Sequence, residues 1–310
     1  MILNIIILLI GLTLLLYSAD QMIHNADLIA KKFSLPPVLI GLTIIALGTS
    51  APELVITLIA ATKTVPASGA IVGNVIGSNI ANILLVLGAS AFFFKIDLSK
   101  IRYKDNIYLF IITAYFSILF YFVDEINLYH SVGFIFLIIL FLNQLRTYEE
   151  VRKENVINEF SNFIYFKLII TFVGIFIGGK VFLDSSLNIF TSFGLDQTII
   201  GITILAIGTS LPELATVVIS YVRKKGSIGI GNVIGSNIMN ILFVLFPGIF
   251  IIQSRNLNFF IPDNITLHLN ILIISTLIIF FLSLAKFTMS KFTSLIFIIC
   301  YVIYIYSVIA

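Results

Sequence analysis

The chain consists of long apolar segments separated by short polar connections. Most segments reach the roughly 20 residues that a helix needs to cross a bilayer, and none shows the alternation of a membrane-barrel strand. The ten segments are Ile2–Ile29, Pro36–Thr62, Ser68–Phe94, Ile107–Phe122, Leu128–Leu145, Phe163–Phe190, Thr198–Val222, Ile228–Ile252, Ile265–Leu284 and Phe292–Val308. We therefore predict an all-α polytopic membrane protein of about ten transmembrane helices.

A polar stretch divides the predicted helices into two groups of five. Residues 1–146 form the first group, residues 147–162 a short connection and residues 163–310 the second group. Because five crossings end on the side opposite to where they began, the second group must enter the membrane from the other side.

Two motifs occur once in each half. The first reads GLTIIALGTSAPEL at Gly41–Leu54 and GITILAIGTSLPEL at Gly201–Leu214; the second reads GNVIGSNIANI at Gly73–Ile83 and GNVIGSNIMNI at Gly231–Ile241. The copies lie 160 and 158 positions apart, and 20 of the 25 aligned positions are identical. This duplication, with five helices in each half, predicts two inverted-topology repeats, an architecture of secondary transporters.

Composition agrees with a membrane protein, and charge orients it. Hydrophobic residues make up 59% of the chain and charged residues only 11%, against about 25% charged in soluble domains. With the N-terminus outside, all but Lys63, Lys180 and Arg255 of the 18 basic residues fall on the inner side. Since cytoplasmic connections collect basic residues, we expect both termini outside and the central connection in the cytoplasm.

Each first motif carries a glutamate directly after a proline, well inside an apolar segment. A carboxylate near mid-membrane costs at least about 2.5–3.5 kcal/mol on insertion scales, so it usually faces a cavity or a partner. Glu53 and Glu213 hold matching positions. Inverted repeats should bring both together near the midplane, where transporters of this architecture bind substrate.

The prolines predict a broken backbone beside these carboxylates. Pro52 and Pro212 have no N–H and crowd the carbonyls four residues earlier. A break would free carbonyls near residues 46–49 and 206–209, which must then line a polar cavity. Such an all-oxygen environment suits hard cations such as Ca²⁺ and Na⁺. Softer metals prefer His or Cys ligands, and neither lies near the motifs.

The second motif adds amides and hydroxyls at helical spacing. Ser78 and Asn82 lie four residues apart, as do Ser236 and Asn240, so each pair shares one helix face. Two Asn and two Glu can then form a four-cornered ring. The serines predicted around this ring are Ser50, Ser78, Ser210 and Ser236.

The same motif contains two glycines four residues apart. These are Gly73 and Gly77 in the first half and Gly231 and Gly235 in the second. This spacing is typical of close helix packing, and we expect these glycines to bring backbones together.

At these motifs the sequence resembles the sodium/calcium exchanger family of the cation/Ca²⁺ exchanger superfamily. GTSAPEL with GNVIGSNIAN, and GTSLPEL with GNVIGSNIMN, are similar to its two α-repeats, and its ten-helix inverted topology covers the whole chain. The resemblance implies that Glu53 and Glu213 are shared Ca²⁺ and Na⁺ ligands and that Asn82 lies at the centre. It further implies Ca²⁺ contacts from the carbonyls of Thr49 and Thr209, and Na⁺ sites built from Ser50, Ser78, Ser210, Ser236 and the carbonyls of Ala46 and Ala206.

The chain departs from part of this family at Asn240. Some prokaryotic members and the K⁺-dependent exchangers carry aspartate there, so asparagine argues against K⁺ co-transport. The central connection is too short for the regulatory Ca²⁺-binding domains of animal members. We therefore expect a bare transport unit in a prokaryotic plasma (inner) membrane. Its partners would be Ca²⁺, Na⁺ and the lipid bilayer, with no cofactor and no nucleic acid; the sequence leaves the oligomeric state open.

The expected function is secondary antiport of Na⁺ against Ca²⁺ by alternating access, electrogenic and independent of K⁺. An H⁺-coupled exchanger of the same superfamily is the first alternative, although those proteins tend to carry GNAVE-like motifs where this chain has GTSAPE and GTSLPE. A cation channel is the alternative from another class, and flux coupling distinguishes it. An ATP-driven pump is disfavoured because no G-x-x-x-x-G-K-[ST] motif occurs. No intramembrane protease constellation is assembled, so an enzyme is not expected.

Overall fold

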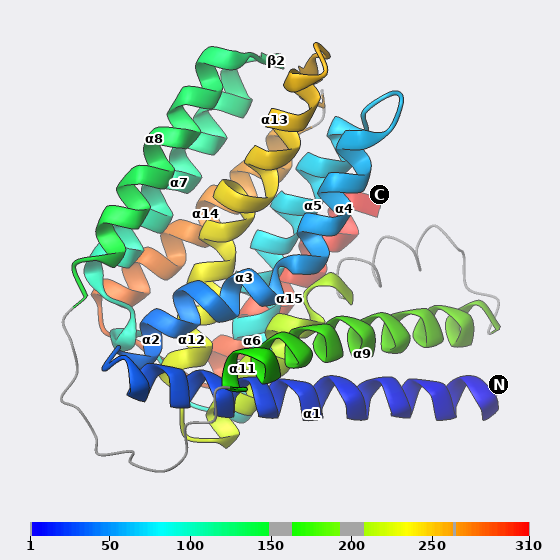
Figure 1. Cartoon of the computed structure of the whole chain (residues 1–310), viewed down its shortest axis with the longest axis vertical. Coiled ribbons are helices and arrows are strands. Elements are labelled where there is room, and N and C mark those ends of the chain that lie inside the picture. Colours follow the sequence, from blue (N-terminus) through cyan, green and yellow to red (C-terminus); the bar gives the residue numbers. More distant parts are fainter. Residues whose placement is uncertain (1, 149–162, 193–207, 263–264, 310) are drawn as a thin grey trace.

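The computed structural model of the protein describes residues 2–148, 163–192, 208–262 and 265–309, and it is built almost entirely of helices (Figure 1). In the first half the elements are α1 (Ile2–Lys32), α2 (Pro37–Ile40), η1 (Gly41–Ile45), α3 (Ala46–Thr49), α4 (Ala51–Thr62), α5 (Ser68–Ala81), η2 (Asn82–Leu87), α6 (Gly88–Phe93), β1 (Ile96–Asp97), η3 (Leu98–Lys100), α7 (Tyr103–Phe122), β2 (Glu125–Ile126) and α8 (Leu128–Leu145). In the second half they are α9 (Ile164–Ser192), α11 (Leu211–Val222), α12 (Gly226–Met239), η4 (Asn240–Leu245), α13 (Phe246–Ser254), β3 (Phe259–Phe260), α14 (Thr266–Leu284), β4 (Thr288–Met289) and α15 (Lys291–Ile309).

The helices have the length and composition of membrane spans. Seven in the described part of the chain are long and apolar enough to cross a bilayer, and the bent pair formed by α2–α3 and α4 would make an eighth. The predicted helical membrane architecture is thus confirmed. The predicted number of ten is not tested, because residues 193–207 lie outside the described residues.

The predicted break before the first glutamate is present. One helix ends at Thr49, the next begins at Ala51, and their axes differ by 44°. Ser50 between them leaves helical geometry with φ −82° and ψ 5°, and Ser210 repeats this with φ −90° and ψ 2°. A proline follows two residues later in each case, and the first turn is where a helix tolerates proline.

Helices α1 and α9 form a pair that lies across one end of the remaining bundle (Figure 1). They touch through glycines. A Cβ added to Gly178 would lie 2.5 Å from the backbone nitrogen of Leu15, and one added to Gly11 would lie 2.6 Å from that of Phe182. Real Cβ contacts are essentially never this short, so only glycine allows the two backbones to approach so closely.

Two short antiparallel ladders join the two halves. Ile96 and Asp97 of β1 pair with Met289 and Thr288 of β4. In the other ladder, β2 and β3 pair Glu125 with Phe260 and Ile126 with Phe259. The two ladders are equivalent when the halves are exchanged. The pair Ile96–Met289 of one ladder corresponds to the pair Phe259–Ile126 of the other, because both positions shift by 163 residues.

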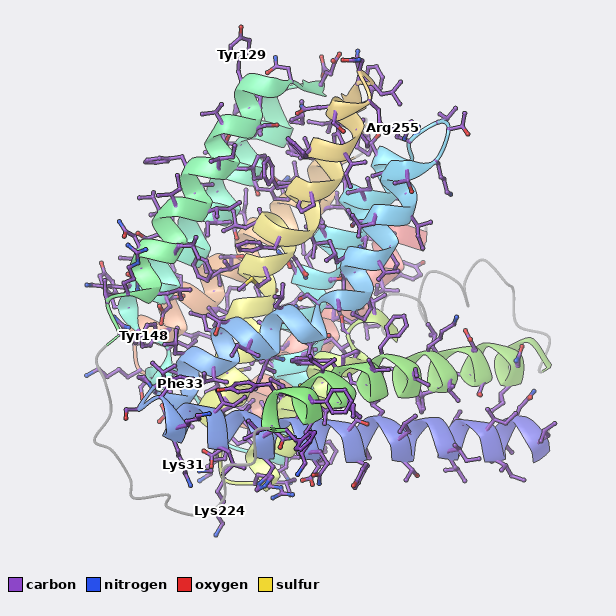
Figure 2. All side chains as sticks on the ribbon, viewed as in Figure 1. Lys31, Phe33, Tyr129, Tyr148, Lys224 and Arg255 are labelled. Atoms are coloured by element: carbon purple, nitrogen blue, oxygen red, sulfur yellow. The ribbon has the colours of Figure 1, made fainter. Side chains whose placement is uncertain are left out.

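Basic residues lie at both ends of the bundle. Figure 2 shows Lys31 and Lys224 at one end, with Tyr129 and Arg255 at the opposite end. The Nη1 atom of Arg255 donates to the carbonyls of Ala61 (2.7 Å) and Lys63 (2.8 Å). One of the basic residues predicted on the outer side therefore caps the end of α4.

The predicted close packing of the repeated glycines is right in one half and wrong in the other. A Cβ on Gly231 would lie 2.4 Å from the carbonyl oxygen of Val38, and one on Gly235 would lie 2.3 Å from that of Leu42. Gly73 and Gly77 have no such neighbour within 4 Å among the described residues; they line a groove of about 370 Å³ with α14 and α15.

Candidate cation site

The two motif glutamates occupy equivalent places in the fold. Glu53 lies in the first turn of α4 and Glu213 in the first turn of α11, and each is 1% exposed. The unpaired backbone N–H groups of a helix N-terminus favour a negative charge there. The carboxylates lie close enough to interact electrostatically, so the structure brings the two predicted charges together.

The second motif supports these carboxylates from the neighbouring helices. Ser78 Oγ on α5 donates to Glu53 Oε1 (3.3 Å), and Asn74 Nδ2 donates to the backbone carbonyl of Glu53 (3.0 Å). Across the repeat boundary, Thr49 Oγ1 donates to Asn232 Oδ1 (3.0 Å) and lies 3.3 Å from Ser236 Oγ. The broken segment before α4 is therefore fastened to α12 of the other half.

Asn82 and Asn240 each begin a π-helical stretch, η2 and η4. Single π-turns inside helices are frequently found at functional sites. Asn82 Nδ2 donates to Asn237 Oδ1 (3.1 Å), and Asn240 Nδ2 donates to Asn79 Oδ1 (2.9 Å). A shift of 158 positions exchanges these two hydrogen bonds, so the asparagines interlock in the same way from both halves.

Buried oxygen atoms without partners gather at this place. A buried polar atom nearly always has a hydrogen bond, yet six site side chains hold oxygens that are unpartnered within the described part of the chain. These atoms are Ser50 Oγ, Glu53 Oε2, Asn82 Oδ1, Ser210 Oγ, Asn240 Oδ1 and both oxygens of Glu213. Hydroxyl, amide and carboxylate oxygens are what a hard cation takes as ligands, so the donor set fits Ca²⁺ or Na⁺.

The other predicted ligands differ in how far the structure supports them. The carbonyl of Ala46 accepts from the Ser50 N–H (3.0 Å), so it stays within the hydrogen bonding of its helix. Thr209 is half-buried, and Ala206 lies outside the described residues.

Sequence reasoning missed four asparagines that the structure places in the site. Asn79 and Asn237 hold Asn82 and Asn240, while Asn74 and Asn232 contact Glu53 and Thr49. All four belong to the repeated second motif. Their retention in both halves was the available signal.

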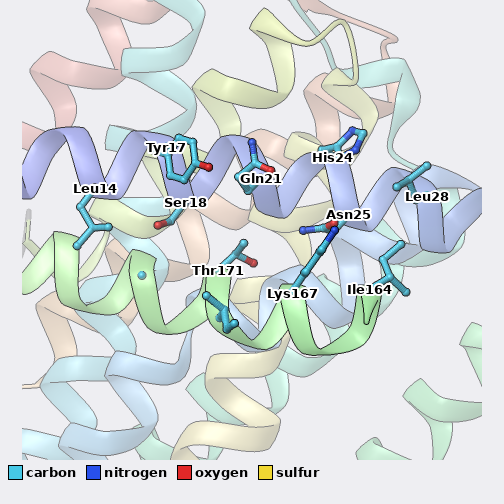
Figure 3. Close-up of a pocket in the computed structure, with 12 residues that line it drawn as sticks. Leu14, Tyr17, Ser18, Gln21, His24, Asn25, Leu28, Ile164, Lys167 and Thr171 are labelled. Carbon is cyan, nitrogen blue, oxygen red and sulfur yellow. The ribbon is translucent and has the colours of Figure 1, made fainter. Parts of the chain in front are cut away.

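A separate cavity lies between α1 and α9. It has a volume of about 570 Å³; α1 contributes Ser18 and Asn25 to its wall, and α9 contributes Lys167 and Thr171 (Figure 3). None of the described residues that line it is acidic. It therefore lacks the carboxylates that a divalent cation requires, and the buried carboxylate pair is the better candidate.

Comparison with known proteins gives consistent results. A sequence profile of the family described as "Sodium/calcium exchanger protein" matches residues 3–143 and 163–310. The chain is 31% identical over 319 residues to the sodium/calcium exchanger MaX1 of Methanosarcina acetivorans, covering 87% of this chain and 90% of that protein. It is 30% identical over 254 residues to the inner membrane protein YrbG of Escherichia coli, covering 77% of each chain. The solved structure of the sodium-calcium exchanger NCX_Mj, soaked with zero Na⁺ and Ca²⁺, superposes with a TM-score of 0.81 at 28% identity over 99% of both chains.

Proposed function

The chain belongs to the sodium/calcium exchanger protein family, and from this premise we propose that it is a secondary antiporter that exchanges Na⁺ for Ca²⁺ across a membrane. The observation that carries this proposal is the cluster of unpartnered buried oxygens around Glu53 and Glu213. Uncompensated burial of polar oxygens and carboxylates is costly. A transported cation would supply the missing interactions.

The roles follow from the geometry of the site. Glu53 and Glu213 would bind both ions and supply the negative charge, and Asn82 and Asn240 would complete the ring with their amide oxygens. Ser50 and Ser210 lie at the helix breaks, and their hydroxyls have no partner among the described residues. They would serve Na⁺ sites beside the Ca²⁺ site. Further contacts to the transported ions would come from the hydroxyls of Ser78 and Ser236 and from the backbone carbonyls of Thr49, Thr209, Ala46 and Ala206.

The architecture that we propose for transport is a pair of inverted repeats, residues 1–146 and 163–310, joined by residues 147–162. Two observations support it: the ladders and the asparagine hydrogen bonds each convert into one another when the halves are exchanged. Such exchange is the signature of a two-fold relation. Alternating access then arises as one group of helices moves against another around the central site.

The proposal includes a location and an ion selectivity. The likeness to an inner membrane protein and the distribution of basic residues support a prokaryotic plasma membrane with both termini outside. Asparagine at both ring positions, 82 and 240, limits the fixed charge to the two glutamates and supports transport without K⁺.

Reconstitution tests the function directly. Vesicles containing the purified protein and loaded with Na⁺ should take up Ca²⁺ when diluted into Na⁺-free medium, and uptake should fail when Na⁺ is present at equal concentration on both sides. The same vesicles with a pH gradient and no Na⁺ provide the comparison. Uptake driven by the pH gradient alone would replace this proposal with an H⁺-coupled exchanger, and uptake driven by the Ca²⁺ gradient alone would indicate a channel.

A further inference from the structure

The amide of Asn240 can offer a cation either its oxygen or its nitrogen, and only the oxygen can bind it. The surroundings of the amide decide which end faces the site. Asn240 is fully buried, and its Nδ2 atom donates to Asn79 Oδ1 at 2.9 Å. The direction of the Asn240 amide therefore depends on the direction of the Asn79 amide.

The direction of the Asn79 amide is set by the backbone. Its Nδ2 atom donates to the main-chain carbonyl of Asn237 at 3.1 Å. A main-chain carbonyl can only accept, so Asn79 must turn its nitrogen toward residue 237 and its oxygen toward residue 240. Only the nitrogen of Asn240 can meet that oxygen, which leaves Asn240 Oδ1 as one of the unpartnered oxygens of the site.

We propose that Asn79 is a positioning residue that holds the Asn240 amide with its oxygen toward the transported cation. The inference rests on the proposed function, because it assigns Asn79 a role at that site. Hydrogen-bonding partners that orient a ligand are typically worth about 10- to 100-fold in metal affinity. Asn79 touches no ion in this scheme and acts entirely through Asn240.

The amide of Asn82, the equivalent residue in the first half, is not oriented by a backbone carbonyl in this way. Asn82 Nδ2 donates to Asn237 Oδ1 (3.1 Å), but Asn237 Nδ2 has no partner within the described part of the chain. Asn82 and Asn237 can turn over together and keep their mutual hydrogen bond. Asn79 is therefore the residue whose loss changes the presentation of a ligand most directly.

A double-mutant cycle on Ca²⁺ binding tests the proposal. The full chain in detergent is unfolded by heat at a series of Ca²⁺ concentrations, and the affinity follows from the stabilisation that Ca²⁺ produces. Asn79→Leu should weaken Ca²⁺ binding by about 10- to 100-fold. Asn240→Ala should weaken it as well, and the double variant should bind no more weakly than Asn240→Ala alone, because residues that act through one another are not additive.

A matched control separates positioning from loss of a buried amide. Asn106 is also buried and donates to a backbone carbonyl, that of Phe280, at 3.1 Å. Asn106→Leu should lower the melting temperature in the absence of Ca²⁺ and leave the Ca²⁺ affinity unchanged. If it weakens Ca²⁺ binding as much as Asn79→Leu does, the proposal is overturned.

The remaining outcomes are also decisive. If the fold-losses of the two single variants multiply in the double variant, so that their free energies add, Asn79 acts independently of Asn240 and the proposal is overturned. Asn79→Ala, which removes the amide without adding bulk, serves in the same cycle if Asn79→Leu does not fold. A wild-type protein that Ca²⁺ does not stabilise would refute the proposed function itself, whereas a stabilised wild type with additive variants refutes only the role of Asn79.

Discussion

Glu53 and Glu213 are the only carboxylates that the described part of the chain places among the unpartnered oxygens of the site. We expect Glu53→Gln and Glu213→Gln each to lower Ca²⁺ uptake by at least about 100-fold, since removing one charge from a pair facing a divalent ion loses several kcal/mol at an effective dielectric constant near 20. The measurement is Ca²⁺/Ca²⁺ exchange in reconstituted vesicles, which needs no Na⁺. Near-normal exchange in either variant would remove that glutamate from the site.

Substitution of Ser50 or Ser210 should affect the Na⁺ dependence of exchange more than its Ca²⁺ dependence. Their hydroxyl oxygens have no partner in the part of the chain that the structure describes, and they lie at the breaks that precede the glutamates. If they serve the Na⁺ sites, Ser50→Ala and Ser210→Ala should raise the Na⁺ concentration needed for half-maximal exchange by about 3- to 10-fold, corresponding to a hydrogen-bond-sized loss near 1 kcal/mol. The Ca²⁺ concentration for half-maximal exchange should change less. An equal rise in both would instead assign the serines to the helix break.

The glutamates, the serines, Asn82 and Asn240 of the candidate site could be singled out from the sequence, because a polar residue retained twice inside an apolar segment is expected to face a cavity or a partner. Asn79 and Asn237 were not distinguished by the spacing argument. Asn79 and Asn237 lie one residue after Ser78 and Ser236, so a rule based on one helix face passed over them. The direction of an amide depends on a carbonyl from the other half of the chain, which no local pattern encodes.

At the scale of elements, the prolines predicted the helix breaks, whereas no sequence pattern predicted the π-helical stretches. Pro52 and Pro212 interrupt regular helices because the ring clashes with the preceding turn. Proline restricts the residue directly before it, and the structure places each break one residue earlier still, at Ser50 and Ser210. Of the π-helical stretches among the described residues, η1 begins at Gly41, and η2 and η4 begin at the motif asparagines Asn82 and Asn240. The 3.6-residue period of the apolar positions does not distinguish such stretches from a regular α-helix.

The repeated glycines give an element-scale prediction with a control inside the same chain. Gly235→Ala places a Cβ 2.3 Å from the carbonyl oxygen of Leu42, whereas Gly77→Ala meets no described atom within 4 Å. Overpacking of this kind typically costs about 1–3 kcal/mol, while alanine gains up to about 1 kcal/mol over glycine in a helix. Gly235→Ala should therefore lower the melting temperature in detergent, and Gly77→Ala should leave it unchanged or raise it. Equal destabilisation by both would mean that Gly77 is packed as tightly as Gly235.

At the scale of the whole molecule, the two halves are joined in several places. The ladders join them through β1–β4 and β2–β3, and the asparagine hydrogen bonds join them at residues that precede the ladder strands in each half. In addition, Asp20 and Asp27 of α1 form ion pairs with Arg223 and Lys225, which lie in the turn between α11 and α12. The repeated motifs predicted that the halves would meet at the glutamates. The ladders carry no repeated sequence signature, since Ile96–Asp97 and Phe259–Phe260 share no residue type.

The net charge of the site predicts how the protein responds to voltage. With asparagine at both 82 and 240, the ring carries two negative charges when both glutamates are ionised. One Ca²⁺ makes the loaded site neutral, and three Na⁺, the number that the family resemblance implies, leave it with one positive charge. Exchange should therefore move one net charge per cycle, worth up to about 2.3 kcal/mol per 100 mV.

Na⁺-loaded vesicles would export three positive charges as Na⁺ for each two imported as Ca²⁺. An inside-positive potential set by a K⁺ gradient and an ionophore should thus speed Ca²⁺ uptake, and an inside-negative potential should slow it. Asn240→Asp adds one negative charge to the ring. It should leave the direction of this response unchanged, because the ions carried per cycle set it, but it would move the charged step from the Na⁺-loaded form to the Ca²⁺-loaded form. Ca²⁺ uptake that depends on the Na⁺ gradient yet ignores the membrane potential would exclude three-for-one exchange and require two Na⁺ for each Ca²⁺.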